Sequence, residues 1–116
     1  MESHNSVIHL ITAPATVIIP PLDGIVTEGS TVTLQCSATG KPNTITYTWK
    51  HASNDIIIGG RYSLNGGSLT ISNIIRDDDG IYTCYASNGV GQPDSASATV
   101  TVYCKYCCMC SVLRGI

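Results

Sequence analysis

Two segments of this chain, 31–39 and 44–50, alternate strictly between apolar and polar residues, and in a third, 81–87, Tyr82, Cys84 and Ala86 fall on one face. Each segment contains one residue of an ordered set. Cys36 lies in 31–39, Trp49 lies in 44–50, and Cys84 lies in 81–87 at the end of the run Asp-Asp-Gly-Ile-Tyr-Thr-Cys. A period of two is typical of half-buried β-strands, whose successive side chains point to opposite faces of a sheet. All three residues fall in the register that we expect to face inward.

The rest of the chain predicts further strands and no helix. We expect strands over 15–19, 24–27, 61–64, 68–72 and 95–103, and a short further strand over 56–58. Pro14 and Pro20-Pro21 restrict the first of these to a sheet edge. Asn65-Gly66-Gly67 predicts a tight hairpin, and residues 73–80 are expected to cross from one sheet to the other.

The order Cys, Trp, Asp-x-Gly-x-Tyr-x-Cys resembles the signature of the immunoglobulin superfamily. The resemblance covers about residues 14–103, and its most specific element is Asp78-x-Gly80-x-Tyr82-x-Cys84. It implies an all-β fold, a two-sheet antiparallel Greek-key sandwich of the intermediate (I-set) or C2 type. It also implies a Cys36–Cys84 disulfide between the sheets, with Trp49 packed on it and Tyr82 at the tyrosine corner.

The implied disulfide closes a loop of 48 residues, which is worth on the order of 3 to 4 kcal/mol in the chain-entropy model. Two reduced, buried cysteines are the alternative, as in some intracellular members of the superfamily. Asp78 matches the acidic position of the motif, and we expect it to meet Arg61 at one end of the sandwich. An exposed pair of this kind contributes only about 0 to 1 kcal/mol.

Several classes of function find no support in the sequence. The net charge is −2, and the six Lys and Arg residues are scattered, which argues against nucleic-acid binding. His4, His9 and His51 are widely separated, and we expect them on the surface. Because three adjacent carboxylates on a turn cannot all point at one ion, we expect 77–79 to form a solvated turn. We therefore expect no enzyme, no cofactor, no bound metal, and no membrane span in this chain.

Both ends of the chain lie outside the resemblance. We expect residues 1–13 to be a disordered extension and 104–116 to be a Cys-rich tail that is disordered or an incorrect or truncated end. The tail contains four cysteines: Cys104, Cys107, Cys108 and Cys110. Zinc binding, acylation and cross-linking between chains are the alternative roles for these cysteines.

Six cysteines in a chain of this length favour an oxidising compartment, where disulfides persist, as the first interpretation and metal binding as the second. No export signal is recognisable at the start of the sequence, where an acidic residue stands in place of basic ones. We therefore expect one domain of a longer extracellular or cell-surface chain. A misplaced start and an intracellular protein are the alternatives.

A mostly uncharged face is the candidate contact site. It combines the outward residues of 81–87 with those of 44–50: Ile81, Thr83, Tyr85, Thr46, Thr48 and Lys50. Tyrosine is enriched in interface cores, whereas the plain alternative is an ordinary sheet surface.

From the resemblance and this face we expect a non-catalytic protein-protein recognition module of a cell-adhesion molecule or cell-surface receptor. It would be one domain of a tandem array that binds a protein ligand or a homophilic partner. An intracellular muscle-type spacer and an ectodomain piece of a receptor tyrosine kinase are the alternatives.

Overall fold

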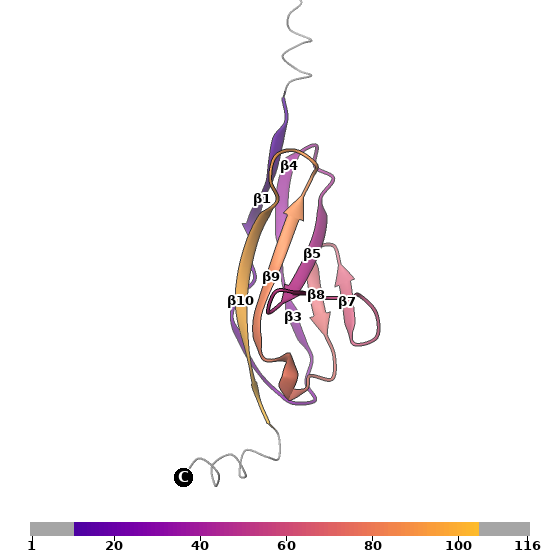
Figure 1. The fold of residues 1–116 in the computed structure, drawn as a ribbon, viewed down its shortest axis with the longest axis vertical. Coiled ribbons are helices and arrows are strands. Elements are labelled where there is room, and N and C mark those ends of the chain that lie inside the picture. The colour runs from indigo at the N-terminus through magenta and orange to yellow at the C-terminus, as the bar shows by residue number, and fades with distance from the viewer. Residues whose placement is uncertain (1–10, 105–116) are drawn as a thin grey trace, which may run out of the picture.

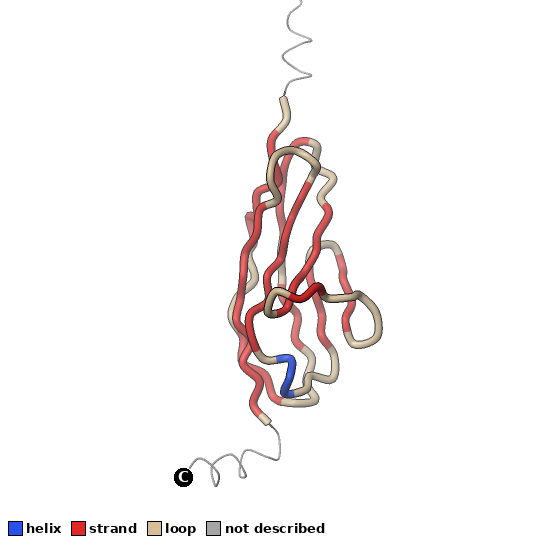
Figure 2. The backbone as a smooth tube through the Cα atoms, in the orientation of Figure 1, coloured by secondary structure: helices blue, strands red, loops and turns tan. Residues whose placement is uncertain are grey.

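The computed structural model describes residues 11–104, whose strands form three hydrogen-bonded sheets arranged as a β-sandwich (Figures 1 and 2). One short 3-10 helix, η1 (Arg76–Asp78), lies near the end of the sandwich at which the described chain finishes. The strands are β1 (Ala13–Ile19), β2 (Gly24–Thr27), β3 (Val32–Leu34), β4 (Ser37–Lys41), β5 (Thr46–His51), β6 (Asn54–Asp55), β7 (Tyr62–Asn65), β8 (Ser68–Ile71), β9 (Gly80–Ser87) and β10 (Asp94–Tyr103).

The sheet order confirms the predicted all-β sandwich. One layer has the order β2-β10-β9-β5-β6, and the other has β3-β8-β7, while β1 pairs with β4. The pairings are antiparallel except for that of β2 with β10, which is parallel. A parallel edge strand follows from the break after β1, because the chain leaves one sheet and joins the other without reversing.

The single strand predicted over 31–39 is divided in two. β3 pairs with β8 as far as Leu34 opposite Leu69, and β4 then pairs with β1. The alternation nevertheless continues through the break, since Leu34, Cys36 and Ala38 are all buried. The β3–β8 pairing ends at Leu69, one residue from the start of β8 at Ser68, where the hairpin turns toward β7.

The strand predicted over 56–58 is wrong. The paired segment is Asn54–Asp55, which lies opposite Lys50 and His51. Ala52 and Ser53 both have positive φ, at 50° and 73°, and they turn the chain back at once so that pairing starts before the isoleucines. Ile57 is instead 82% exposed.

The hairpin between β7 and β8 is confirmed. Asn65 pairs with Ser68, so Gly66 and Gly67 form a two-residue loop. Gly66 has φ +61°, which suits the first central position of a type II′ turn. An added Cβ on Gly67 would lie 2.0 Å from the carbonyl oxygen of Cys36, so only glycine allows this close approach.

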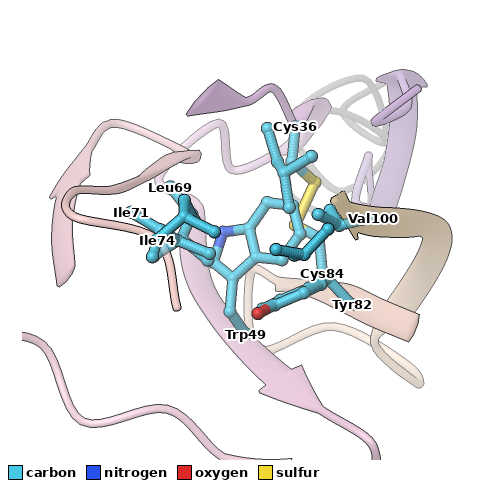
Figure 3. Packing of buried hydrophobic residues seen from close by; sticks show 10 residues of the cluster. Cys36, Trp49, Leu69, Ile71, Ile74, Tyr82, Cys84 and Val100 are labelled. Atoms are coloured by element: carbon cyan, nitrogen blue, oxygen red, sulfur yellow. A yellow bond between two sulfur atoms is a disulfide. The ribbon is translucent and has the colours of Figure 1, made fainter. Parts of the chain in front are cut away.

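The core surrounds the disulfide, as Figure 3 shows. Cys36 and Cys84 are bonded, which confirms the predicted pair. Trp49 is 3% exposed beside them, and its indole N–H donates to the Gly67 carbonyl at 3.0 Å. Further aliphatic and aromatic side chains complete this cluster: Leu34, Leu69, Ile71, Ile74, Tyr82, Val100 and Val102.

The described strands extend slightly past the predicted domain limits. β1 begins at Ala13, opposite Lys41, whereas we expected the extension to include residue 13. Cys104, expected in the tail, is buried at 6% exposed. We therefore propose that the domain runs from Ala13 to Cys104. Cys107, Cys108 and Cys110 lie outside the described residues, as do residues 1–10.

Candidate functional site

The predicted residues fall into two groups on different parts of the sandwich. One group surrounds Asp78 at the end where η1 lies, and the other covers the outer face of β5 and β9. The first group turns out to hold the fold together, whereas the second faces solvent.

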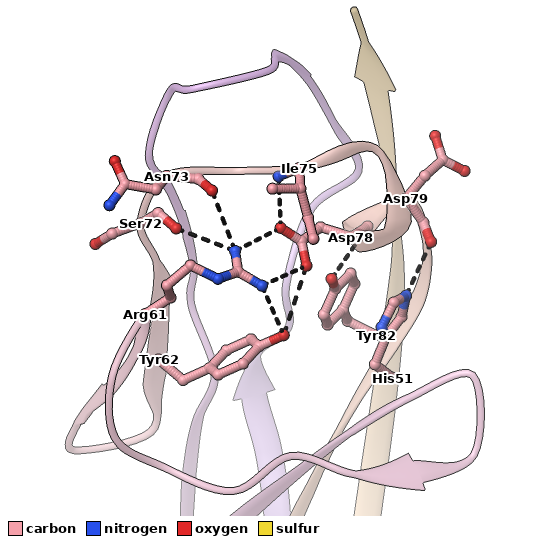
Figure 4. Close-up of polar contacts among 9 residues, drawn as sticks. All are labelled: His51, Arg61, Tyr62, Ser72, Asn73, Ile75, Asp78, Asp79 and Tyr82. Atoms are coloured by element: carbon pink, nitrogen blue, oxygen red, sulfur yellow. Dashed lines mark hydrogen bonds and ion pairs between the residues drawn. The ribbon is translucent and has the colours of Figure 1, made fainter.

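Asp78 is the buried centre of a polar network (Figure 4). Its side chain is 3% exposed and forms an ion pair with Arg61, with a distance of 2.7 Å between Oδ2 and Nη1. The second guanidinium nitrogen donates to Oδ1 at 3.1 Å, and the Ile75 N–H donates to Oδ2 at 2.8 Å. The contact with Arg61 agrees with the prediction, but the expected exposed pair and solvated turn are wrong for this carboxylate.

The environment of Asp78 favours its charged form. Burial by itself raises the pKa of a carboxyl, but the hydrogen bonds from Arg61 and from the Ile75 N–H outweigh it. The pKa of Asp78 therefore lies below its ordinary value. Arg61 also donates to the carbonyls of Ser72 and Asn73, both at 3.2 Å, so one guanidinium joins the start of β7 to the crossover that leads to β9.

Tyr82 lies on the opposite side of Asp78 from Arg61. Its hydroxyl donates to the Asp78 carbonyl, four residues earlier, which is the geometry of a tyrosine corner. Burial and then the charge of Asp78 raise the pKa of Tyr82 well above its ordinary value, so the hydroxyl stays a donor.

His51 is not the plain surface residue that we expected. Its ring stacks on Tyr82 with centroids 4.3 Å apart, and its Nε2 donates to the Asp79 carbonyl at 2.8 Å. Gly80 has φ +131°, and an added Cβ would lie 3.1 Å from His51 Nε2. The glycine of the motif is thus required both by the backbone conformation and by the stacked ring.

The candidate contact residues do share one outward face. Thr46, Thr48 and Lys50 of β5 lie opposite Ser87, Tyr85 and Thr83 of β9. Lys50 Nζ lies 5.6 Å from the centroid of the Tyr85 ring, and it also lies 3.7 Å from Asp55 Oδ1 on β6. The single positive charge of this face is therefore partly neutralised, and Ile81 adds an apolar side chain that is 54% exposed.

The sequence did not reveal how far this face extends. β10 lies between β9 and β2, and the hydroxyls of Ser97 and Thr83 are 2.8 Å apart. Ile25 of β2 is 67% exposed and Tyr103 of β10 is 54% exposed on the same side. The alternation of 95–103 signalled the outward position of Tyr103, but the addition of β2 as the next strand depends on sheet order, which no local pattern encodes.

A cavity of about 310 Å³ opens at the other border of this sheet. It lies beside β5, and its walls include Tyr47, Trp49, Ile56, Ile58 and Leu64. The mostly apolar lining suits an apolar group rather than an ion or a phosphate. No sequence motif indicated this cavity, because its walls come from three separate segments.

Within 11–104, no three or more His, Cys, Asp or Glu side chains are grouped as metal ligands. In the same range no helix has the length and apolar character needed to cross a membrane.

Comparisons with known proteins agree with this geometry. The family model described as "Immunoglobulin domain" matches residues 14–88. Human protein turtle homolog A is 35% identical over 98 residues, which cover 80% of this chain and 8% of that protein. Human cell adhesion molecule 1 is 37% identical over 75 residues, which cover 65% of this chain and 16% of that protein.

A solved structure of three immunoglobulin domains of titin superimposes with a TM-score of 0.72 at 34% identity, and it covers 79% of this chain and 33% of the titin chain. This chain therefore spans only a small part of each of these relatives. Because the family model covers more than half of the 116 residues, and the sandwich, disulfide and tyrosine corner agree with it, the chain belongs to the immunoglobulin domain family.

Proposed function

We propose that this domain is a non-catalytic protein-recognition module of a cell-adhesion molecule or cell-surface receptor. It acts as one domain of a longer chain and contacts its protein partner through the outer face of β5 and β9. The observation that carries the proposal is this face itself, where Tyr85 and Ile81 stand among threonines and the one lysine is paired with Asp55. Such a surface loses little hydration energy when a partner covers it.

The likeness to cell adhesion molecule 1 supports the adhesion reading, since the name of that protein states its role. The disulfide supports an extracellular location, because disulfides persist in oxidising compartments. The polar network around Asp78 does not favour a catalytic role, because its hydrogen bonds join the crossover before β9 to the start of β7. Asp78 is buried and already accepts hydrogen bonds from Arg61 and Ile75.

Replacement of Tyr85 by aspartate tests the proposed face. The variant places a charge at the centre of the face, next to Thr48, without entering the core. Ser63→Asp is the matched control, since Ser63 is exposed on β7 of the other sheet. Self-association is measured by sedimentation equilibrium, and heterophilic binding by staining intact cells with a tetramer of the chain.

We expect at least one of these two signals for the unaltered chain, a loss of at least tenfold in Tyr85→Asp, and no loss in Ser63→Asp. Equal loss in both variants, or no effect of Tyr85→Asp, would contradict the assigned face. If neither self-association nor cell binding occurs, the recognition function itself is wrong.

A structural spacer is the second candidate, and the likeness to a solved chain that holds three immunoglobulin domains of titin supports it. The two candidates differ in the state of the Cys36–Cys84 pair in protein from its native source. Mass spectrometry after thiol blocking measures this state directly. An oxidised pair supports the cell-surface module, whereas a reduced pair supports an intracellular spacer.

A further inference from the structure

The five-stranded sheet has an incomplete border at β5. β6 pairs only with Lys50 and His51, and one further bond runs from the Ile56 N–H to the Trp49 carbonyl at 3.1 Å. Before Trp49, within the described part of the chain, β5 has a strand neighbour only on its β9 side. Residues 46–48 are therefore an open sheet edge. In variable-type immunoglobulin domains, further strands extend this sheet.

The open edge presents main-chain groups of Tyr47. The backbone N–H and C=O of one residue in an antiparallel strand point to the same side, and residues two apart repeat that direction. The Trp49 carbonyl points toward β6, so the N–H and C=O of Tyr47 point to the same border. Among residues 11–104, no hydrogen bond joins these two groups to another segment.

The apolar cavity lies directly beside this edge. Tyr47, Thr48 and Trp49 belong to its wall, together with Ile58 and Leu64. Thr48 is also a member of the outward face of β5 and β9, so the cavity borders the proposed contact face, although Tyr85 does not line it. Main-chain groups at a sheet edge together with a neighbouring side-chain pocket are the two elements of peptide recognition by strand addition.

We propose that the β5 edge binds an extended segment of a protein partner, which adds a strand beside Tyr47 and places a large aliphatic side chain in the cavity. This inference rests on the proposed recognition function and specifies how part of the partner is held. The bound segment is uncharged at its centre, because Asp55, the charged residue of the cavity wall, already pairs with Lys50. The apolar walls select Leu, Ile or Met over a polar residue.

A capped pentapeptide with the sequence Ser-Thr-Leu-Thr-Ser serves as the probe. Two matched peptides have alanine at the centre or carry N-methyl groups that remove the main-chain donors. The full chain is labelled with ¹⁵N, and the Tyr47 amide and the Trp49 indole N–H are followed by NMR during titration. Trp49 is the only tryptophan, so its indole signal reports on the cavity wall without ambiguity.

We expect the leucine peptide to shift both signals and to slow hydrogen exchange at the Tyr47 amide. The alanine peptide is expected to bind more weakly by roughly tenfold, since burial of the larger side chain drives insertion. The N-methylated peptide is expected not to bind. Equal binding of the leucine and alanine peptides, or no change at the Tyr47 amide, would overturn the proposal.

Two neighbouring isoleucines give a matched pair of variants. Ile58 lines the cavity and is 47% exposed, whereas Ile57 is 82% exposed and lies outside its walls. Ile58→Ser should weaken binding of the leucine peptide at least threefold, and Ile57→Ser should leave it unchanged. Equal effects of the two variants would contradict an aliphatic anchor in this cavity. Thermal unfolding of each variant verifies that both are folded.

The Tyr85→Asp variant separates this inference from the proposed face. Tyr85 lies on β9, so the peptide should bind that variant as it binds the unaltered chain. Loss of peptide binding in Tyr85→Asp would refute an independent site at the edge. If the free chain at high concentration already protects the Tyr47 amide and loses that protection on dilution, the occupant is a second copy, and the assignment to a partner segment is wrong.

Discussion

Replacement of Asp78 by alanine should be among the most damaging single changes in this domain. The carboxylate is 3% exposed and accepts hydrogen bonds from Arg61 and from the Ile75 N–H. Loss of one partner from a buried pair costs about 3 to 5 kcal/mol. Because the Arg61 side chain is 30% exposed, water can partly replace the carboxylate, and we expect about 2 to 4 kcal/mol.

The assay is urea unfolding followed by the emission of Trp49, which is buried in the native core. A loss of this size is a large part of the roughly 5 to 15 kcal/mol that stabilises an ordinary domain. It should lower the melting temperature by roughly 10 to 25 °C. Asp77→Ala is the control, since Asp77 is an exposed aspartate in the same 3-10 turn, and we expect it to change stability by less than about 0.5 kcal/mol.

The dependence on pH gives a second test of the same reasoning. The pKa of Asp78 is lowered by folding, so its contribution is fully present above the unfolded value of about 3.9 and disappears as pH falls through the folded value. The difference in stability between the unaltered chain and Asp78→Ala should therefore shrink below about pH 4. Equal losses in Asp78→Ala and Asp77→Ala at neutral pH, or a difference that grows toward low pH, would refute the reasoning.

Two further predictions concern the core. Reduction of the Cys36–Cys84 disulfide removes a constraint on a loop of 48 residues and should lower the free energy of unfolding by about 3 to 4 kcal/mol. Urea unfolding with and without dithiothreitol measures this loss, and an unchanged midpoint would contradict it. Gly67→Ala should lower the midpoint strongly, because its Cβ would lie 2.0 Å from the Cys36 carbonyl oxygen. Gly24→Ala is the control, since nothing lies within 4 Å of its Cβ position, and equal effects of the two changes would refute the close-approach argument.

Some of the candidate face was visible in the sequence, and some was not. Thr48 and Tyr85 were placed outward by alternation alone, and the register puts them directly opposite each other. Ile25 was missed because it joins this face only through the pairing of β2 with β10. The open edge at Tyr47 was also missed. It exists because β6 pairs only with Lys50 and His51, and the length of that pairing cannot be predicted from the residues of β5.

The sequence by itself determined the strands with strong alternation, the two-residue hairpin and the family motif, because these depend on side-chain period and on backbone preferences of a few adjacent residues. The tertiary structure alone decided that Asp78 is buried. The family motif distinguished Asp78 from Asp77 and Asp79 and predicted its contact with Arg61, but 77–79 was expected to be a solvated turn. The burial depends on the approach of Arg61, directly before β7, to η1. Tertiary structure likewise decided that 54–55 pairs in place of 56–58, since β propensity is local whereas the choice of a strand partner is not.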